Sequence, residues 1–223
     1  MVFTGIIRSK GYGWFTEASA GTGPSWAQGT TGGWVLSGVA ADGLSARSRP
    51  PASATSPCPA VGDGDGGFWD GIQLGDSVAV NGVCLTATSL PLATPASELP
   101  GSVADKLPAS CGPAPVVVTF FVMAESRAIT TFGALAGWKP TADAASDVVG
   151  VNIERALRHG AELGGHVVSG HVHGMVAVAA VEEPGDGSRK LWLAVPRMLP
   201  TASSIVYKGS VTLDGVSLTV AEV

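Results

Sequence analysis

Residues 77–86 read SVAVNGVCLT, and residues 210–219 read SVTLDGVSLT. Six of these ten positions are identical, although the two stretches lie far apart in the chain. In each of them an Asn or Asp precedes a glycine between two apolar runs, a pattern that is typical of a tight turn joining two strands. The chain therefore contains one β-hairpin motif twice, and a repeat of this kind indicates a duplicated β-domain.

A weaker match precedes each copy of the hairpin. Residues 3–7 read FTGII and residues 168–172 read VSGHV, with the glycine in the same place. The spacing between these two segments is longer than the spacing between the two hairpins, so an insertion in the first copy would account for the difference. We therefore predict an N-terminal domain over residues 1–160 and a C-terminal domain over residues 161–223.

Further strands are predicted between and after the two hairpins. Residues 116–122 are β-branched and aromatic, residues 167–178 are strand-like with two glycine breaks, and residues 190–195 form a third apolar run. Residues 152–158 fit either a short helical turn or the end of a strand. Short strands with turn signals and few helical periods indicate an all-β barrel or sandwich.

Three stretches interrupt this pattern, near residues 11–70, 89–114 and 134–147. They are rich in Gly, Pro, Ala and Ser, and neither a helical nor a strand period persists in them. We interpret most of residues 11–70 as loop or disordered insertion. Two origins stay open: real insertions that loop out of the barrel at modest entropic cost, or translated non-coding sequence.

Composition excludes several classes of function. The 223 residues carry a net charge of −5 and no basic cluster, which argues against nucleic-acid binding. No run of about 18 apolar residues is present, so no membrane span is predicted. Three widely spaced cysteines argue against a disulfide framework and for a reducing compartment. A cytoplasmic protein is therefore expected, with a plastid as the alternative if a transit peptide has been removed.

Several blocks of the sequence, in one order, resemble riboflavin synthase of the α-chain type. Together they cover a little over half of the chain, which is far more specific than any single short motif. The blocks are residues 3–6, 75–86, 123–126 with 130–133, 151–156, 164–174 and 207–219.

The resemblance implies two similar six-stranded Greek-key barrels and a C-terminal helix that assembles a homotrimer. Only four residues follow residue 219, so the second barrel is expected to be truncated and the trimer helix to be absent. In the family, the active site lies between the N-terminal barrel of one subunit and the C-terminal barrel of the next.

The resemblance also implies a reaction. Two molecules of 6,7-dimethyl-8-ribityllumazine dismutate to riboflavin and 5-amino-6-(D-ribitylamino)uracil, with no metal and no cofactor. The C7 methyl group of one lumazine must lose a proton, so a general base and hydrogen-bond donors to the ring are needed. Stacking two flat substrates in one site is worth about 7–11 kcal/mol when they are well oriented.

Site residues follow by the same resemblance. Cys84 and His171 are the predicted polar catalytic residues, with Ser217, Thr86 and Thr219 as hydrogen-bond donors. The predicted substrate-binding residues of the N-terminal half-site are Phe3, Gly5, Ile6, Ile7, Val83, Cys84, Leu85, Phe121, Val122, Met123, Ala124, Glu125 and Ser126. Those of the C-terminal half-site are Gly170, His171, Val172, Lys208, Ser217, Leu218 and Thr219.

Other interpretations stay open at this point. Cys84 on a strand fits a small buried hydrophobe as well as a catalytic thiol. His166, His171 and His173 are close in sequence, but no Cys or carboxylate lies near them to complete a metal site, and no metal is predicted. The alternative function is a lumazine- or flavin-binding protein without catalysis, or an inactive fragment of the synthase.

Overall fold

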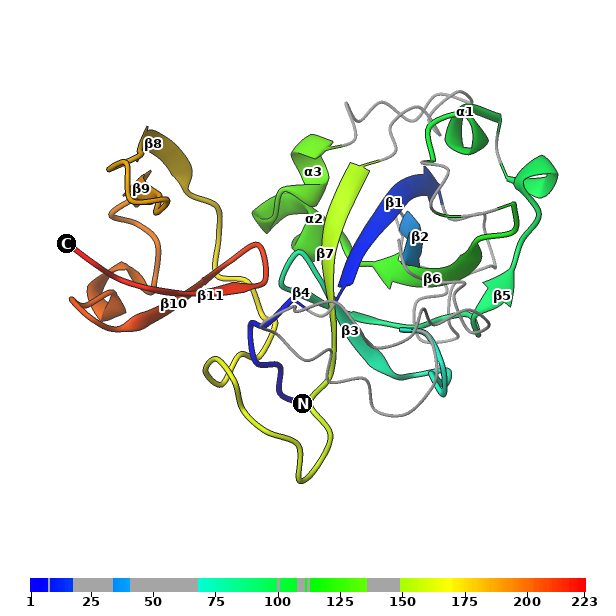
Figure 1. Cartoon of the computed structure of the whole chain (residues 1–223), viewed down its shortest axis with the longest axis horizontal. Helices are drawn as coiled ribbons and strands as arrows, with labels where there is room; N and C mark the ends of the chain where they lie inside the picture. The colour runs from blue at the N-terminus through cyan, green and yellow to red at the C-terminus, as the bar shows by residue number, and fades with distance from the viewer. Residues whose placement is uncertain are drawn as a thin grey trace.

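The structure is a computed structural model of the chain. It describes residues 1–7, 9–17, 34–40, 68–99, 101–107, 111, 113–135 and 149–223. Most of its regular secondary structure consists of antiparallel strands, and its helices are short (Figure 1). The helices are α1 (Gly101–Ala104), α2 (Ala124–Ile129), α3 (Phe132–Leu135) and the 3-10 turns η2 (Ala96–Glu98) and η4 (Ala202–Ser204). None of the described helices has the length and apolar character that a membrane crossing requires.

The larger part of the molecule is a seven-stranded antiparallel sheet in the order β4-β3-β7-β1-β2-β6-β5. Its strands are β1 (Ser9–Glu17), β2 (Trp34–Ala40), β3 (Ser77–Val80), β4 (Val83–Thr86), β5 (Leu92–Ala93), β6 (Val116–Val122) and β7 (Val149–Arg155). An isolated bridge between Ala87 and Phe120 joins the residue after β4 to β6. The sheet therefore curls until its β4 end meets β6, as expected for a strongly twisted barrel-like sheet.

The core lies inside this curled sheet and follows the alternation of strands. In β4, Val83 and Leu85 are buried, whereas Cys84 is half-buried and Thr86 is exposed. Successive side chains of a strand point to opposite faces, so Cys84 lies on the outer face. The buried core residues are Trp69, Ile72, Val78, Val80, Val83, Leu85, Ala87, Val118, Phe120, Val122, Phe132, Val151 and Ile153.

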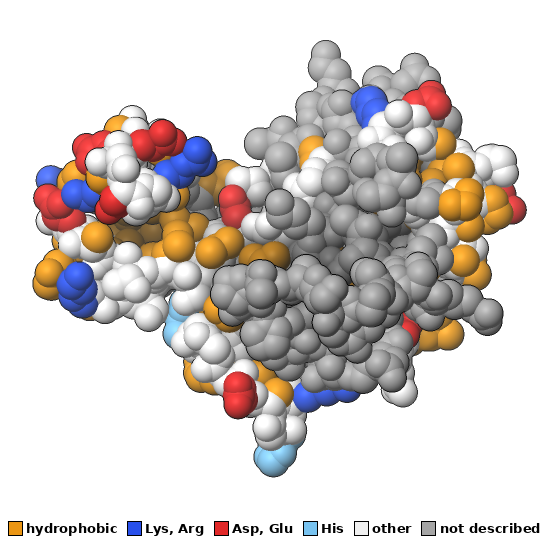
Figure 2. All heavy atoms as spheres, in the orientation of Figure 1, with side chains coloured by type: hydrophobic (Ala, Val, Ile, Leu, Met, Phe, Trp, Pro, Cys, Tyr) orange, Lys and Arg blue, Asp and Glu red, His pale blue; other side chains and the backbone are white. Residues whose placement is uncertain are grey.

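The C-terminal part consists of two separate hairpins. One is formed by β8 (Ala177–Glu182) and β9 (Lys190–Ala194), the other by β10 (Ser210–Leu213) and β11 (Val216–Thr219). All six residues of β8 are exposed. Figure 2 shows hydrophobic side chains across this part of the surface. The all-β prediction with an incomplete second barrel is confirmed, because these hairpins form two-stranded sheets that do not close.

The repeated hairpin motif folds as predicted in both copies. The turn residues Asn81 and Gly82 have φ of 46° and 76°, and Asp214 and Gly215 have φ of 45° and 82°. Two successive positive φ angles define the turn that matches the twist of a two-residue hairpin. Local sequence therefore determines this element in both surroundings. The predicted strands at residues 116–122 and 190–195 are also present, as β6 and β9.

Three predictions need correction or a decision. The interpretation of residues 11–70 as mostly loop was wrong for β1 and β2, which are central strands of the sheet. Glycines at positions 11, 13 and 38 interrupt the alternation of apolar and polar residues in these segments. Hydrogen-bonded pairing with strands that are distant in sequence nevertheless keeps the segments extended. Residues 167–176 form no regular strand, and β8 begins only at Ala177. Of the two alternatives for residues 152–158, the strand end is correct, because strand β7 runs to Arg155.

The other predicted insertions are described only in part. Within residues 89–114, Leu99, Val103 and Cys111 form a small second cluster of buried residues against Val117 of β6. Residues 136–148, most of the third stretch, lie outside the described residues, as do residues 18–33 and 41–67 of the first. The proposed boundary between domains at residues 160 and 161 stays a prediction.

Candidate functional site

The two copies meet through their equivalent N-terminal segments. Phe3 and Val168, which correspond in the repeat, form an antiparallel bridge. The N–H of Phe3 donates to the carbonyl of Val168 at 2.7 Å, and the N–H of Val168 donates to the carbonyl of Phe3 at 3.0 Å. Equivalent residues that pair with one another indicate an approximate twofold relation between the copies.

The same relation continues at the hairpins. The N–H of Cys84 donates to the carbonyl of Gly170 at 2.9 Å, and the N–H of Ser217 donates to the carbonyl of Gly5 at 2.8 Å. Cys84 corresponds to Ser217 in the repeat, and Gly170 corresponds to Gly5. Each copy therefore covers the free edge of the hairpin of the other copy, where an unpaired strand would otherwise expose its N–H and C=O groups.

Both glycines are needed for this close approach. A Cβ on Gly5 would lie 2.8 Å from the Cβ of Ser217, and a Cβ on Gly170 would lie 2.7 Å from the Cβ of Cys84. Gly5 and Gly170 also share a positive φ, 72° and 74°. A side chain at either position would be strained in its backbone and would displace the residue predicted to act in catalysis.

The turns of the two hairpins touch as well. A Cβ on Gly82 would lie 2.6 Å from the backbone N of Gly215. Asn152 of β7 links both turns: its backbone N–H donates to the Oδ1 of Asn81, and its Nδ2 donates to the carbonyl of Asp214. In Figure 1 the turn of β10–β11 accordingly reaches over to β4. Cys84 and Ser217 each lie two residues beyond the point of contact.

A buried carboxylate fixes the N-terminal segment against the main sheet. Glu154 of β7 is 3% exposed. Its Oε1 accepts hydrogen bonds from the N–H of Thr4 at 2.7 Å and the Oγ1 of Thr4 at 2.6 Å, and its Oε2 accepts one from the N–H of Gly5 at 3.1 Å. Charge-assisted hydrogen bonds of this kind are strong, so Glu154 holds Gly5 in place for the Ser217 contact.

The surroundings of Cys84 are those of a protonated thiol. Its Sγ lies 3.1 Å from the Sδ of Met1. Burial raises the pKa of the Cys84 thiol above its ordinary value, and the neighbouring Ser77 hydroxyl only partly offsets this effect. A thiolate is the nucleophilic form of cysteine, so at neutral pH this side chain is a poor nucleophile.

The surroundings of Ser217 are polar. The Nδ1 of His166 lies 2.7 Å from the Oγ of Ser217, and the Nε2 of the same ring lies 3.1 Å from the Oγ1 of Thr212. The backbone N–H of His166 donates to the carbonyl of Thr4. From the sequence, His166 was weighed only for a metal site. The signal that could have found it is the repeat, because the offset that aligns Phe3 with Val168 also makes His166 equivalent to Met1, the neighbour of Cys84.

The remaining predicted residues of the first half-site divide into two groups. Phe3, Val83, Leu85, Phe121 and Val122 have buried side chains, so they shape the site from the core side. The others lie at least partly at the surface, and α2 carries three of them: Ile6, Ile7, Thr86, Met123, Ala124, Glu125 and Ser126.

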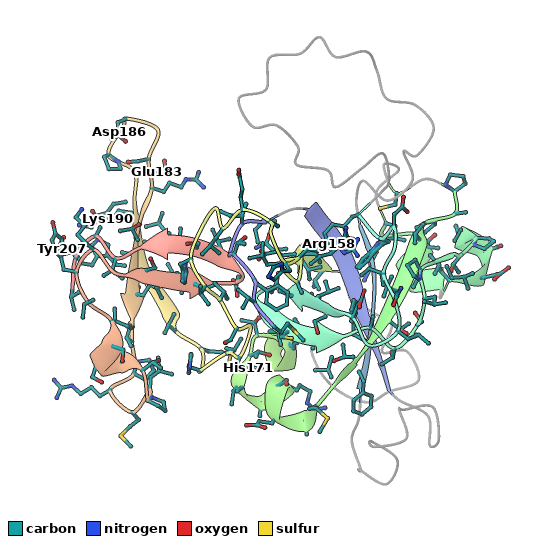
Figure 3. The ribbon with its side chains drawn as sticks, turned by 90° about the horizontal axis from the view of Figure 1, so that it is seen from below. Arg158, His171, Glu183, Asp186, Lys190 and Tyr207 are labelled. Atoms are coloured by element: carbon teal, nitrogen blue, oxygen red, sulfur yellow. The ribbon has the colours of Figure 1, made fainter. Side chains whose placement is uncertain are left out.

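The predicted residues of the second half-site are more scattered. His171 is exposed beside the junction, and Val172 packs against the main core. Lys208 has a φ of 63° and its Nζ lies over the ring of Tyr207. Figure 3 shows Tyr207 at the far end of the C-terminal part from His171, so Lys208 is not brought to the junction. Leu218 is half-buried on β11 and Thr219 is exposed.

Two further observations concern metal-binding and charged side chains among the described residues. No cluster of three or more His, Cys, Asp or Glu side chains among them is arranged to hold a metal ion. On the hairpin distant from the junction, Lys190 contacts the carboxylate of Glu222 at 2.6 Å and lies over the ring of Trp192. This pair ties β9 to the residues after β11.

Comparison with known proteins agrees with this architecture. Residues 169–223 match the family described as the lumazine binding domain. LumP complexed with 6,7-dimethyl-8-(1'-D-ribityl) lumazine has a similar structure, with a TM-score of 0.54 and 17% identity over 99% of this chain and 81% of that one. LumP complexed with flavin mononucleotide gives a TM-score of 0.53 at 16% identity, with the same coverage. The fold is therefore that of the lumazine-binding β-barrel proteins.

Sequence comparison gives a more specific likeness within that class. The chain is 33% identical to riboflavin synthase of Escherichia coli (strain K12) over 156 residues, which is 69% of this chain and 56% of that protein. It is 36% identical to riboflavin synthase of Brucella abortus (strain 2308) over 151 residues, 67% of this chain and 58% of that protein. The chain is thus a relative of the riboflavin synthases, as the motifs predicted, and it spans a little over half the length of those it matches.

Proposed function

We propose that this chain acts in riboflavin synthesis, in the dismutation of two 6,7-dimethyl-8-ribityllumazine molecules to riboflavin and 5-amino-6-(D-ribitylamino)uracil. The observation that carries the proposal is the reciprocal junction, in which Cys84 and Ser217 receive equivalent backbone contacts from Gly170 and Gly5. A reaction between two identical molecules suits two equivalent half-sites. The identity of 31–36% to riboflavin synthases supports the same chemistry.

The second half-site supplies the proposed base and two proposed donors, and the first half-site supplies a third donor. The reaction needs a base that removes a proton from the C7 methyl group and donors that stabilise the charge spread over the ring. His171 is the proposed base, because it is an exposed imidazole beside Gly170 at the junction. Ser217, Thr219 and Thr86 are the proposed hydrogen-bond donors to the ring.

Productive stacking of two lumazines requires two half-sites that face each other. By resemblance to the family, the facing half-sites belong to neighbouring subunits of a homotrimer. We propose that this chain binds one lumazine beside Cys84 and another beside Ser217, and that a second copy of the chain completes each stacked pair. The oligomeric state measured by sedimentation in the presence and absence of lumazine tests this part of the proposal, and a strictly monomeric active chain contradicts it.

The proposal is tested by mixing the purified chain with 6,7-dimethyl-8-ribityllumazine and following absorbance and fluorescence. The riboflavin spectrum should appear, and it should appear much more slowly with Ser217→Ala or His171→Ala. The matched control is His159→Ala, which removes an exposed histidine outside the proposed site and should leave the rate unchanged. Bound lumazine without any riboflavin contradicts catalysis.

The second candidate function is lumazine or flavin binding without catalysis. It is favoured by the C-terminal part, where β8–β9 and β10–β11 are separate two-stranded sheets and all six residues of β8 are exposed. A half-site built on such hairpins excludes water less well than the Cys84 half-site, and water exclusion strengthens the electrostatic contribution to catalysis. A lumazine fluorescence change that stays constant with time is the result this alternative predicts.

A further inference from the structure

The two copies differ in chemistry at one pair of equivalent contacts. In the first copy the Sγ of Cys84 lies 3.1 Å from the Sδ of Met1, and in the second copy the Oγ of Ser217 lies 2.7 Å from the Nδ1 of His166. The offset that aligns Phe3 with Val168 also aligns Met1 with His166. Duplication has therefore left a thiol beside a thioether in one half-site and a hydroxyl beside an imidazole in the other.

Only the second of these pairs has directed hydrogen bonding. A thiol and a thioether are weak hydrogen-bonding groups, whereas hydroxyl and imidazole each donate and accept well. The ring of His166 is also held from its other side, because its Nε2 lies 3.1 Å from the Oγ1 of Thr212. A neutral imidazole has one donor and one acceptor nitrogen, so the chain from Thr212 through His166 to Ser217 is satisfied in either tautomer.

The backbone holds this chain of side chains in place. The N–H of His166 donates to the carbonyl of Thr4, and the N–H of Ser217 donates to the carbonyl of Gly5. Thr4 and Gly5 are themselves fixed by the buried carboxylate of Glu154. His166 and Ser217 are thus attached to the same two-residue support from both sides, and Thr212 and Ser217 are paired neighbours on β10 and β11.

From this geometry we propose that His166 is a positioning residue that orients the Ser217 hydroxyl toward the bound lumazine, so that Ser217 directs a hydrogen bond to the ring and its counterpart Cys84 does not. The inference rests on the proposed function of the junction and specifies how its two halves differ. His166 acts through Ser217 and need not touch the ligand. A misplaced hydroxyl costs rate even when the ligand still binds, because orientation contributes strongly to catalysis.

The test compares three substitutions of His166 that differ in the polar atom they keep. His166→Ala keeps none, His166→Asn places an amide near the position of Nδ1, and His166→Gln reaches the position of Nε2 beside Thr212. We expect His166→Ala to lower kcat by about tenfold or more while KM for lumazine changes by less than about threefold. His166→Asn should recover most of the rate, and His166→Gln should recover less.

Two outcomes of that comparison overturn the inference. The first is a His166→Ala variant with the wild-type kcat, and the second is a His166→Asn variant as slow as His166→Ala, since a merely structural role depends on ring size. Thermal unfolding of all variants checks that they fold, and the Asn and Gln variants carry the test if the Ala variant does not fold. His159→Ala serves as the matched loss of an exposed histidine.

The ring nitrogens give a readout that does not depend on turnover. In 15N spectra of the histidine-labelled chain, Ser217→Ala should shift the ring signals of His166, and lumazine should shift them in the wild-type chain but not in Ser217→Ala. A chain that binds lumazine without making riboflavin defeats the proposed function, while these shifts still support the inference. If the ring signals of His166 shift neither in Ser217→Ala nor on addition of lumazine, the inference is overturned, whether or not riboflavin is made.

Discussion

The hairpins β3–β4 and β10–β11 share six of ten residues and nearly the same φ angles in their turns, yet they lie in different surroundings. Val78 and Val80 of the first hairpin are almost completely buried in the main core. Their counterparts Val211 and Leu213 are only half-buried. Local sequence therefore specifies the hairpin and its turn, while the other strands of the sheet determine how much stability the same residues contribute.

The largest expected effect concerns the support that the two hairpins share. Replacing Glu154 with Ala should lower the free energy of unfolding by about 3 kcal/mol or more, because the buried N–H groups of Thr4 and Gly5 and the Thr4 hydroxyl lose their acceptor. Glu154→Gln keeps one carbonyl oxygen and should cost less. Urea unfolding followed by tryptophan fluorescence measures both variants, and equal losses for Gln and Ala contradict the assignment.

The next prediction tests the difference in burial directly. Val78→Ala should destabilise the chain by about 2–3 kcal/mol, since it removes two buried methyl groups and leaves a cavity. Val211→Ala, the same change at the equivalent position, should cost less than about 1 kcal/mol because that side chain is half-exposed. The same unfolding assay compares them. Equal costs would show that the second hairpin is packed as tightly in solution as the first.

A glycine pair sharpens the comparison at the point where the hairpins touch. Gly82→Ala should cost about 1–3 kcal/mol from its positive φ alone, and more because the new Cβ would lie 2.6 Å from the backbone of Gly215. Gly75 has a φ of 90° but open space around it, so Gly75→Ala isolates the backbone strain. Thermal unfolding should show a larger drop for Gly82→Ala. A drop no larger than that of Gly75→Ala would mean that the turns separate freely.

The sequence predicts this molecule well where the information is local. The Asn-Gly and Asp-Gly turns, the apolar run of β6 and the correspondence of Cys84 with Ser217 follow from short stretches of sequence. Strands β1 and β2 were missed because their glycines hide the alternation and their pairing partners are distant. The bridge between Phe3 and Val168 joins segments that lie far apart in the sequence, and no local pattern predicts such a contact.

The candidate site was predictable to the same extent. The repeat located Cys84, Ser217, Gly5 and Gly170, and all four meet at the junction. The position of Lys208 away from it depends on the path of the chain through residues 196–208, which carry no repeat. The role inferred for His166 required the distance to Ser217, because histidines near a glycine-rich segment suggest several uses until a partner is known.

The smallest expected effect is chemical and compares the two half-sites at one atom. Because burial raises the pKa of the Cys84 thiol, its thiolate fraction at pH 8 is lower than that of an ordinary cysteine. Iodoacetamide should therefore modify Cys84 several-fold more slowly in the folded chain than in urea, and the folded rate should still be rising with pH where the unfolded rate has levelled off. The background is Cys58→Ser with Cys111→Ala, which leaves one thiol.

Exchanging the two groups reverses this prediction. In the double variant Cys84→Ser with Ser217→Cys, the thiol lies where the Ser217 hydroxyl is 2.7 Å from the Nδ1 of His166. An imidazole beside a thiol favours the thiolate, so alkylation should be faster than at Cys84 and should level off at lower pH. Adding His166→Asn should remove this advantage. Equal alkylation rates at the two positions would show that the half-sites are chemically equivalent, and the contrast between Met1 and His166 would then have no consequence for reactivity.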